Sequence, residues 1–494
     1  MTDTMIEFAS ASSGPKTWTI AELFLLGATA GAAAYVANDW IALPAIGILW
    51  LAWKYLRDDD GLPILPMAMT FQWMQVTVGI WYFAATGRQI ATMNISDYRP
   101  MVLIGLGCVA SLAVGLGAGI NFIRMRRAAR PTETEHRAMV PIGWSGVLIS
   151  YAAILALQGS IQKVAYLFPD FTQAILALRF VHLAVLFIIL RRLSQPVLRW
   201  PFIAVLIMFE VVLGASGFFA GFREPLVMAV VALAEIFNAR RLQHWIVLGA
   251  FAIVMVVISV MWMSVRAEYR QDFDNETFAN SRSAQVDRMA TLSSGWWQDS
   301  HDFANDTDSL IDRLWVIYYP ALAVSRVPSV LPHTDGSIMW GALQHVLSPR
   351  VFFPTKAELQ NDSEMVRKYS GVRVASTETG TSIAFGYAGE SYIDFGVPLM
   401  FVPVFLYGLL AGLTYEMLSK RIRYDELRAG LLAVIFWLAL FLFERSWVKT
   451  LGLFGTLVIY LGGPALLLDY FLSRHQPTGD EPDSLSHPME QWSR

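Results

Sequence analysis

Two carboxylates near the end of a long polar segment could supply a proton acceptor. Glu390 and Asp394 stand four residues apart in the run Gly-Glu-Ser-Tyr-Ile-Asp-Phe-Gly, so on a helix both would face one side. A carboxylate that is partly removed from water has a raised pKa and can accept a proton near neutral pH. The alternative is that these acids stabilise a helix N-terminus through its dipole. Spacing alone favours the dipole role for Asp394 and leaves both roles open for Glu390.

Three cations lie in segments that would hold them rigidly. Arg223 is in the short turn Gly-Phe-Arg-Glu-Pro, and Arg350 and Lys356 are in the proline-punctuated run Ser-Pro-Arg-Val-Phe-Phe-Pro-Thr-Lys. A guanidinium can bind a phosphate through two parallel hydrogen bonds. For Arg223 the alternative is an ion pair with Glu224, or a side chain that extends out of the membrane. The pattern therefore predicts either a phosphate contact or a structural cation.

Other polar groups are better explained as structural. Glu210 precedes Arg223 by thirteen residues, about 20 Å along a helix, so the two cannot contact one ligand atom. A buried partner such as Arg179 or His182 is expected for Glu210. No metal site is predicted, because the histidines lack zinc-ligand spacing and the two Asp-x-Asp pairs lie in polar, solvated stretches. The histidines are His301, His333 and His345, and the Asp-x-Asp pairs are Asp272 with Asp274 and Asp306 with Asp308.

The composition identifies a membrane protein. Of the 494 residues, 55% are hydrophobic and 16% are charged, and the mean hydropathy is +0.46. Soluble domains average about 45–50% apolar and about 25% charged residues. The net charge of −3 excludes a general attraction to nucleic acid, and the single cysteine, Cys108, excludes a disulfide scaffold. The predicted fold class is an all-α polytopic membrane protein.

Apolar segments set the predicted topology. A bilayer core about 30 Å thick needs about 20 apolar residues per helix. Twelve segments fit: 18–36, 39–56, 63–86, 100–123, 139–157, 172–190, 200–222, 225–239, 244–264, 392–418, 429–444 and 451–472. Arg and Lys collect in four loops, around residues 124–137, 191–199, 240–241 and 420–428. Because such loops are usually cytoplasmic, an even number of spans places all four loops and both termini in the cytoplasm of a bacterial inner membrane.

This topology divides the chain into four parts. Residues 1–264 hold nine transmembrane helices, and residues 265–391 form a large outer loop that we expect to fold as a mostly helical periplasmic cap. Residues 392–472 hold transmembrane helices ten to twelve, and residues 473–494 form a polar cytoplasmic tail that we expect to be disordered. No internal repeat is present, and only one half carries a large loop. This asymmetry argues against a transporter with two matching halves.

The layout and two short motifs resemble the Wzy-type O-antigen and exopolysaccharide polymerases, of the O-antigen polymerase and ligase superfamily. Pro349, Arg350, Pro354 and Lys356 are similar to that family's proline-arginine to proline-x-lysine-proline segment. The run from Gly389 to Gly396 is similar to its Gly-Glu-x-Tyr-x-Asn-Phe-Gly stretch. Ala357 stands where proline is common, and Asp394 where asparagine is common. The motifs cover a few dozen residues, and the similarity in layout extends over about residues 18–472.

The resemblance implies a metal-independent membrane glycosyltransferase without a cofactor. Its substrates would be glycans on undecaprenyl diphosphate at the periplasmic face, in contact with membrane lipid, with a chain-length regulator as a protein partner and no nucleic acid. Glu390, Arg223 and Arg350 are the expected catalytic residues. Expected substrate contacts are Lys356, Arg313, Arg326, Glu378, His333 and Tyr392. Glu378 and His333 are also the next candidates for the base.

Two alternatives stay open. An O-antigen ligase would use the same donor but transfer the glycan to lipid A core, and nothing in the sequence separates it firmly from a polymerase. A flippase or transporter of lipid-linked sugars would need charges lining a central cavity, whereas charges within the predicted spans are few. A glycosyltransferase with a catalytic acid in a large first outer loop is disfavoured, because Asn38-Asp39 is too short.

Overall fold

A computed structural model shows an all-helical protein. It describes residues 19–57, 62–90, 93, 98–128, 143–168, 171–195, 198–214, 223–237, 241–298, 302–348, 352–353, 355–356, 361–374 and 382–474. No strand occurs among these residues, which confirms the predicted all-α class. The predicted tail, 473–494, lies almost entirely outside them.

The first ten helices correspond to the first nine predicted spans. They are α1 (Ile20–Ala37), α2 (Ala42–Leu56), α3 (Ile64–Thr86), α4 (Arg99–Ala128), α5 (Trp144–Leu167), α6 (Thr172–Ala177), α7 (Arg179–Ser194), α8 (Trp200–Gly214), α9 (Arg223–Glu235) and α10 (Leu242–Gln271). The sixth predicted span is divided between α6 and α7.

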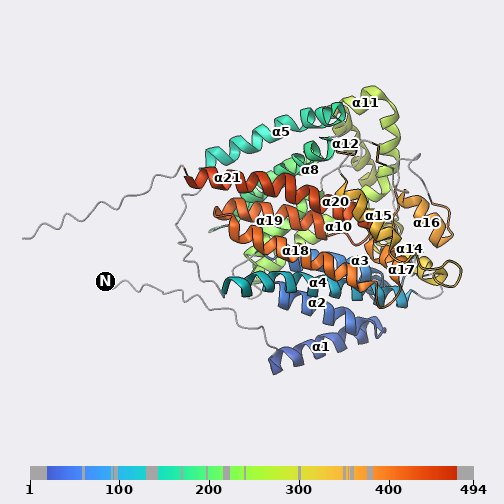
Figure 1. The fold of residues 1–494 in the computed structure, drawn as a ribbon. Helices are drawn as coiled ribbons and strands as arrows, with labels where there is room; N and C mark the ends of the chain where they lie inside the picture. The colour runs from blue at the N-terminus through green and yellow to red at the C-terminus, as the bar shows by residue number, and fades with distance from the viewer. Residues whose placement is uncertain are drawn as a thin grey trace, which may run out of the picture.

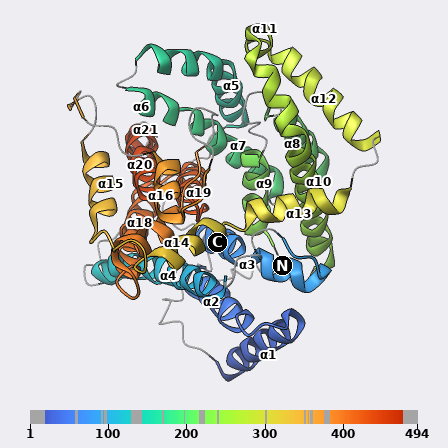
Figure 2. The ribbon, with the colours of Figure 1, turned by 90° about the vertical axis from the view of Figure 1, so that its right-hand side faces the viewer.

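The long segment after α10 forms a cluster of shorter helices at one end of the bundle, on the right in Figure 1. We call α11 to α17 the end cluster. Its members are α11 (Glu276–Asn280), α12 (Arg282–Gln298), α13 (Phe303–Leu314), α14 (Tyr318–Arg326), α15 (Ser337–Leu347), α16 (Asp362–Ser370) and α17 (Gly386–Phe395). Figure 2 views this end directly and shows α13 and α14 crossing over the bundle, with α15 at its edge.

The remaining helices return to the bundle. They are α18 (Phe401–Arg421), α19 (Asp425–Leu440), α20 (Trp447–Leu457), the π-helical turn Val458–Gly462 and α21 (Gly463–Arg474). Six helical segments are long and apolar enough to cross a membrane. These segments are Ile20–Ala37, Arg99–Arg126, Thr172–Ser194, Leu242–Gln271, Phe401–Arg421 and Trp447–Phe471. Each of the twelve predicted segments contains a helix, but the count of twelve crossings stays a prediction.

The tenth predicted span begins later than its apolar pattern indicates. Residues 392–395 belong to α17, and the membrane-length helix α18 starts only at Phe401. Gly396 separates the two helices with a φ of +62°, a conformation that residues with a Cβ rarely adopt. Glu390 and Asp394 therefore lie on a short helix of the end cluster and not on the entering span.

Glycines bring α4 and α18 into backbone contact. A Cβ on Gly115 would lie 2.3 Å from the carbonyl oxygen of Phe405, and one on Gly412 would lie 2.2 Å from that of Leu116. Small residues permit this close approach between apolar helices. Because α17 leads directly into α18, this packing fixes α17 against the bundle.

Candidate functional site

The end cluster and the bundle enclose a cavity of about 280 Å³ between α15, α16, α17 and the start of α20. Its lining combines two carboxylates, two aliphatic hydroxyls, an ammonium and a tyrosine phenol with small and apolar side chains. The lining residues are Thr334, Ser337, Ile338, Gly341, Ala342, Asp362, Met365, Lys368, Tyr369, Glu390 and Val448. A pocket with a few polar groups on an apolar wall is typical of a small-molecule site.

Glu390, the predicted base, lines this cavity from α17. The residue is 5% exposed, and its Oε2 accepts the backbone N–H of Trp447 at 2.7 Å, at the start of α20. Its other oxygen has no hydrogen-bond partner among the described residues. Burial raises the pKa of Glu390 to about 8, and the nearby carboxylates of Asp362 and Asp394 act in the same direction. The predicted rise in the pKa of Glu390 is confirmed. Glu390 also caps a helix N-terminus, but the helix is α20 and not the one that follows Glu390 in the chain.

Asp362, which we did not predict from the sequence, lines the cavity together with Glu390. Its Oδ2 pairs with Lys449 Nζ at 2.6 Å and accepts the Ser382 hydroxyl at 3.3 Å. Lys449 also donates to Ser382 at 3.0 Å. The only sequence signal for this pair is a lysine, Lys449, within an apolar segment.

Two buried glutamines of α3 form hydrogen bonds with the segments that flank the site. The connection between α19 and α20 is non-helical, and Gln75 Nε2 donates to Phe441 O at 2.7 Å while Gln72 donates to Leu440 O. Gln72 Oε1 accepts the hydroxyl of Tyr387 on α17 at 2.5 Å. Irregular backbone between apolar helices needs such internal partners. The two amides, three residues apart, were a signal that the sequence analysis missed.

Two predicted site residues are engaged at the ends of α15. Asp394 accepts the N–H groups of Ile338 at 3.0 Å and Met339 at 2.8 Å, so it caps the N-terminus of α15. Asp394 therefore stabilises a helix N-terminus, as predicted. The helix is α15, which lies more than fifty residues earlier in the chain. Lys356 Nζ donates to the carbonyls of His345 and Ser348, at the C-terminus of the same helix. A substrate contact by Lys356 would compete with this cap.

His333 and Tyr392 contact each other beside α17. His333 Nδ1 lies 3.1 Å from Tyr392 O, and its Nε2 lies against Gly396. The Tyr392 hydroxyl donates to Val327 O at 3.0 Å, and burial raises the pKa of Tyr392. Tyr392 is two residues from Glu390 in the chain and His333 contacts Tyr392, but neither residue lines the cavity.

The predicted cations differ in their surroundings. Arg313 forms a two-point ion pair with Glu444, at 2.6 and 2.8 Å, and this pairing raises its pKa. Arg326 lies against Gly371, and its buried Nε has no hydrogen-bond partner among the described residues. A guanidinium nitrogen without a partner is a candidate anion contact. Arg350 and Glu378 lie outside the described residues, and of Arg223 only the backbone, at the start of α9, is described.

Glu210 has the structural partner that the sequence predicts. Its Oε1 lies 2.8 Å from His182 Nε2 and accepts the hydroxyl of Tyr151. The three side chains join α5, α7 and α8 and are buried. In the described part of the chain, no group of three or more His, Cys, Asp or Glu side chains is arranged to hold a metal ion.

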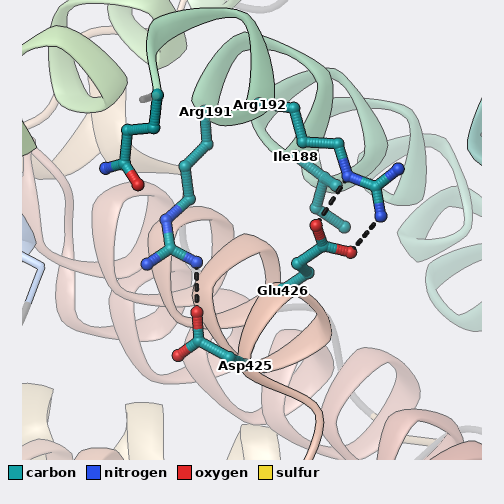
Figure 3. A pocket seen from close by; sticks show the side chains of 6 residues that line it. Ile188, Arg191, Arg192, Asp425 and Glu426 are labelled. Atoms are coloured by element: carbon teal, nitrogen blue, oxygen red, sulfur yellow. Dashed lines mark hydrogen bonds and ion pairs between the residues drawn. The ribbon is translucent and has the colours of Figure 1, made fainter. Parts of the chain in front are cut away.

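A second pocket, of about 460 Å³, lies where the last turn of α7 meets the first turn of α19 (Figure 3). Arg191 pairs with Asp425, and with Glu235 at 2.7 Å, while Arg192 Nε donates to Glu426 at 2.6 Å. α19 has 16 residues, so this pocket, at its first turn, lies about 24 Å from the other end of that helix. Its arginines are fully engaged in ion pairs that join helices, so we assign it no ligand.

The cavity at the end cluster can therefore bind a small polar molecule and exchange a proton with it. Glu390 Oε2 accepts the Trp447 N–H while the carboxyl lines the cavity, and Asp362 is held in place by Lys449. The sequence model of a domain family of unknown function, DUF8712, matches residues 118–420. The chain belongs to this family. The matched region runs from α4 to α18 and includes the whole end cluster. Comparison with curated proteins and with solved structures gave no match.

Proposed function

We propose that the protein is a membrane glycosyltransferase that polymerises undecaprenyl-diphosphate-linked oligosaccharide units into O-antigen or exopolysaccharide at the periplasmic face. The observation that carries this proposal is the position of Glu390. A buried carboxylate that lines a cavity, with a pKa of about 8 and one oxygen without a hydrogen-bond partner among the residues described, has the properties of a general base for an acceptor hydroxyl. The resemblance of residues 389–396 to the polymerase motif supports the same assignment.

In the proposed reaction, Glu390 takes the proton of the acceptor hydroxyl while the hydroxyl oxygen attacks the anomeric carbon of the donor glycan. The bond from that carbon to the diphosphate breaks, and negative charge collects on the leaving diphosphate. Cations that are already positioned stabilise such charge strongly in a site with little water. Arg326, whose buried Nε has no hydrogen-bond partner in the described part of the chain, is proposed for this role together with Arg223 and Arg350, which are proposed from the sequence.

The arrangement of basic residues supports a periplasmic position for the end cluster. Arg191 and Arg192 meet the start of α19, and Lys420 and Arg421 end α18 just before it. These basic clusters lie at the opposite end of the bundle from the end cluster. The positive-inside rule then assigns them to the cytoplasm.

Reconstitution tests the function and separates the alternatives. Purified protein in liposomes receives lipid-linked repeat units, and the products are separated by length. A ladder of products longer than one unit supports a polymerase. Transfer only when lipid A core is supplied would indicate a ligase, and movement of the lipid-linked sugar across the bilayer without new bonds would indicate a flippase. Either result would replace the polymerase proposal.

Thiol labelling tests the orientation. Cysteines at Ser293 and Ser348 should react with a membrane-impermeant reagent in intact spheroplasts, and a cysteine at Thr132 should not. Cys108 is buried and provides the unreactive background. Labelling of Thr132→Cys from outside would reverse the orientation and remove the periplasmic assignment.

A further inference from the structure

One face of helix α15 exposes two large apolar side chains, Trp340 and Leu347, with the exposed Gln344 between them. Trp340 is 67% exposed and Leu347 is 74% exposed, and seven residues, about two helical turns, separate them. The opposite face of α15 lines the cavity with Ile338, Gly341 and Ala342. α15 thus has the cavity on one side and exposed side chains on the other. Figure 2 shows α15 at the periphery of the end cluster.

The position of α15 places this face beside an apolar helix. α15 packs along α20, which begins the candidate membrane span Trp447–Phe471. Val448 lines the cavity beside α15, and a Cβ on Gly452 would lie 3.8 Å from Val346. α15 therefore follows the span over at least four of its residues, about 6 Å. α15 thus lies beside the first residues of that candidate span.

Backbone N–H and C=O groups at the two ends of α15 form hydrogen bonds with side chains of the protein. Asp394 accepts N–H groups at the N-terminus, and Lys356 donates to carbonyls at the C-terminus. At a helix end in water, solvent can satisfy these groups, whereas in an apolar environment the protein must supply the partners. A short helix with both ends capped by charged side chains is suited to a place with little water.

We propose that α15 is an interfacial helix whose Trp340–Leu347 face contacts the acyl chains of the membrane. Phe352, which follows the helix, is 76% exposed, and the neighbouring span exposes Ile459, Leu467 and Phe471. Tryptophan is enriched at the membrane interface, in agreement with Trp340. The cavity behind α15 is then reached from the level of the leaflet, which suits a substrate with a lipid tail.

Spin labelling in lipid nanodiscs tests this proposal without any assay of glycosyl transfer. Labels are placed at Trp340→Cys and Leu347→Cys, with Glu364→Cys on the exposed side of α16 as the matched control. Cys108 is buried and can stay in place. Collision with oxygen, which concentrates in acyl chains, is compared with collision with a water-soluble nickel chelate.

The expected result is a ratio of oxygen to nickel collisions severalfold higher at both α15 positions than at Glu364. Water-like ratios at both positions would overturn the proposal. So would labels shielded from both reagents, since that result would mean that protein, a second copy or a partner, covers the face. A protein that fails to polymerise glycans but gives the expected ratios would overturn only the proposed function.

Discussion

Replacement of Glu390 by glutamine distinguishes a general base from a helix cap. At pH 7 a carboxyl with a pKa of about 8 is about nine-tenths protonated, so glutamine resembles its predominant state. Glu390→Gln should therefore fold normally and still accept the Trp447 N–H through its amide oxygen. If Glu390 is the base, chain growth should fall about 10²–10⁴-fold while lipid-linked substrate still binds. If Glu390 only caps α20, Glu390→Gln would lose at most about 1 kcal/mol of interaction with the helix dipole, and activity would stay near normal.

The pH dependence of activity provides a second measurement of the same role. Between pH 7 and pH 9 the ionised fraction of Glu390 rises from about one-tenth to about nine-tenths, so the wild-type rate should rise about tenfold. The residual rate of Glu390→Gln should not follow this profile. Glu364→Gln, on the exposed side of α16, is the matched control and should behave as the wild type. Near-normal chain growth by Glu390→Gln would refute the base assignment and direct attention to Glu378 or His333.

The pH dependence of the free energy of unfolding tests whether Glu390 is buried, independently of any activity. The folded protein holds this proton more tightly than the unfolded chain, because burial raises the pKa from 4.5 to about 8. The contribution of this bound proton to the free energy of unfolding is complete below about pH 4.5 and is lost as the pH rises through 8. Between pH 6 and pH 8 the free energy of unfolding should fall by about 2 kcal/mol. Wild type should lose this amount relative to Glu390→Gln in unfolding experiments, and parallel profiles would show that the carboxyl is not buried.

Three further changes test the surroundings of the site. Arg326→Ala should weaken binding of lipid-linked diphosphate in a liposome assay about 10- to 100-fold, with poor rescue by lysine, because a hydrogen bond to a charged group contributes about 1.5–3 kcal/mol. Lys449→Met leaves the Asp362 carboxylate without its ammonium and should cost about 1–3 kcal/mol of unfolding free energy, less when combined with Asp362→Asn. Lys356→Met leaves carbonyls of α15 unpaired and should speed amide hydrogen exchange in that helix, and unchanged exchange would argue against the cap.

The sequence by itself determined the helical class and the position of most helices. Apolar runs of the right length predict helices because the rule is local, and each of the twelve predicted segments contains one. The partner of Glu210 was also accessible to sequence reasoning. A carboxylate in an apolar helix must find a polar partner, and few are available, among them His182. The pKa rise of Glu390 followed from the same argument on burial.

Only the tertiary structure decided what surrounds those residues. Asp362 and Lys449 are 87 residues apart in the chain, and they meet because α16 and α20 border the same cavity. Lys356 has the motif context of a substrate cation, yet its ammonium is bound by carbonyls at the end of α15. Periodicity specifies which face of a helix is apolar, but not which helix covers that face. Long-range packing, such as the glycine contact of α4 with α18, therefore determines which polar groups share a site.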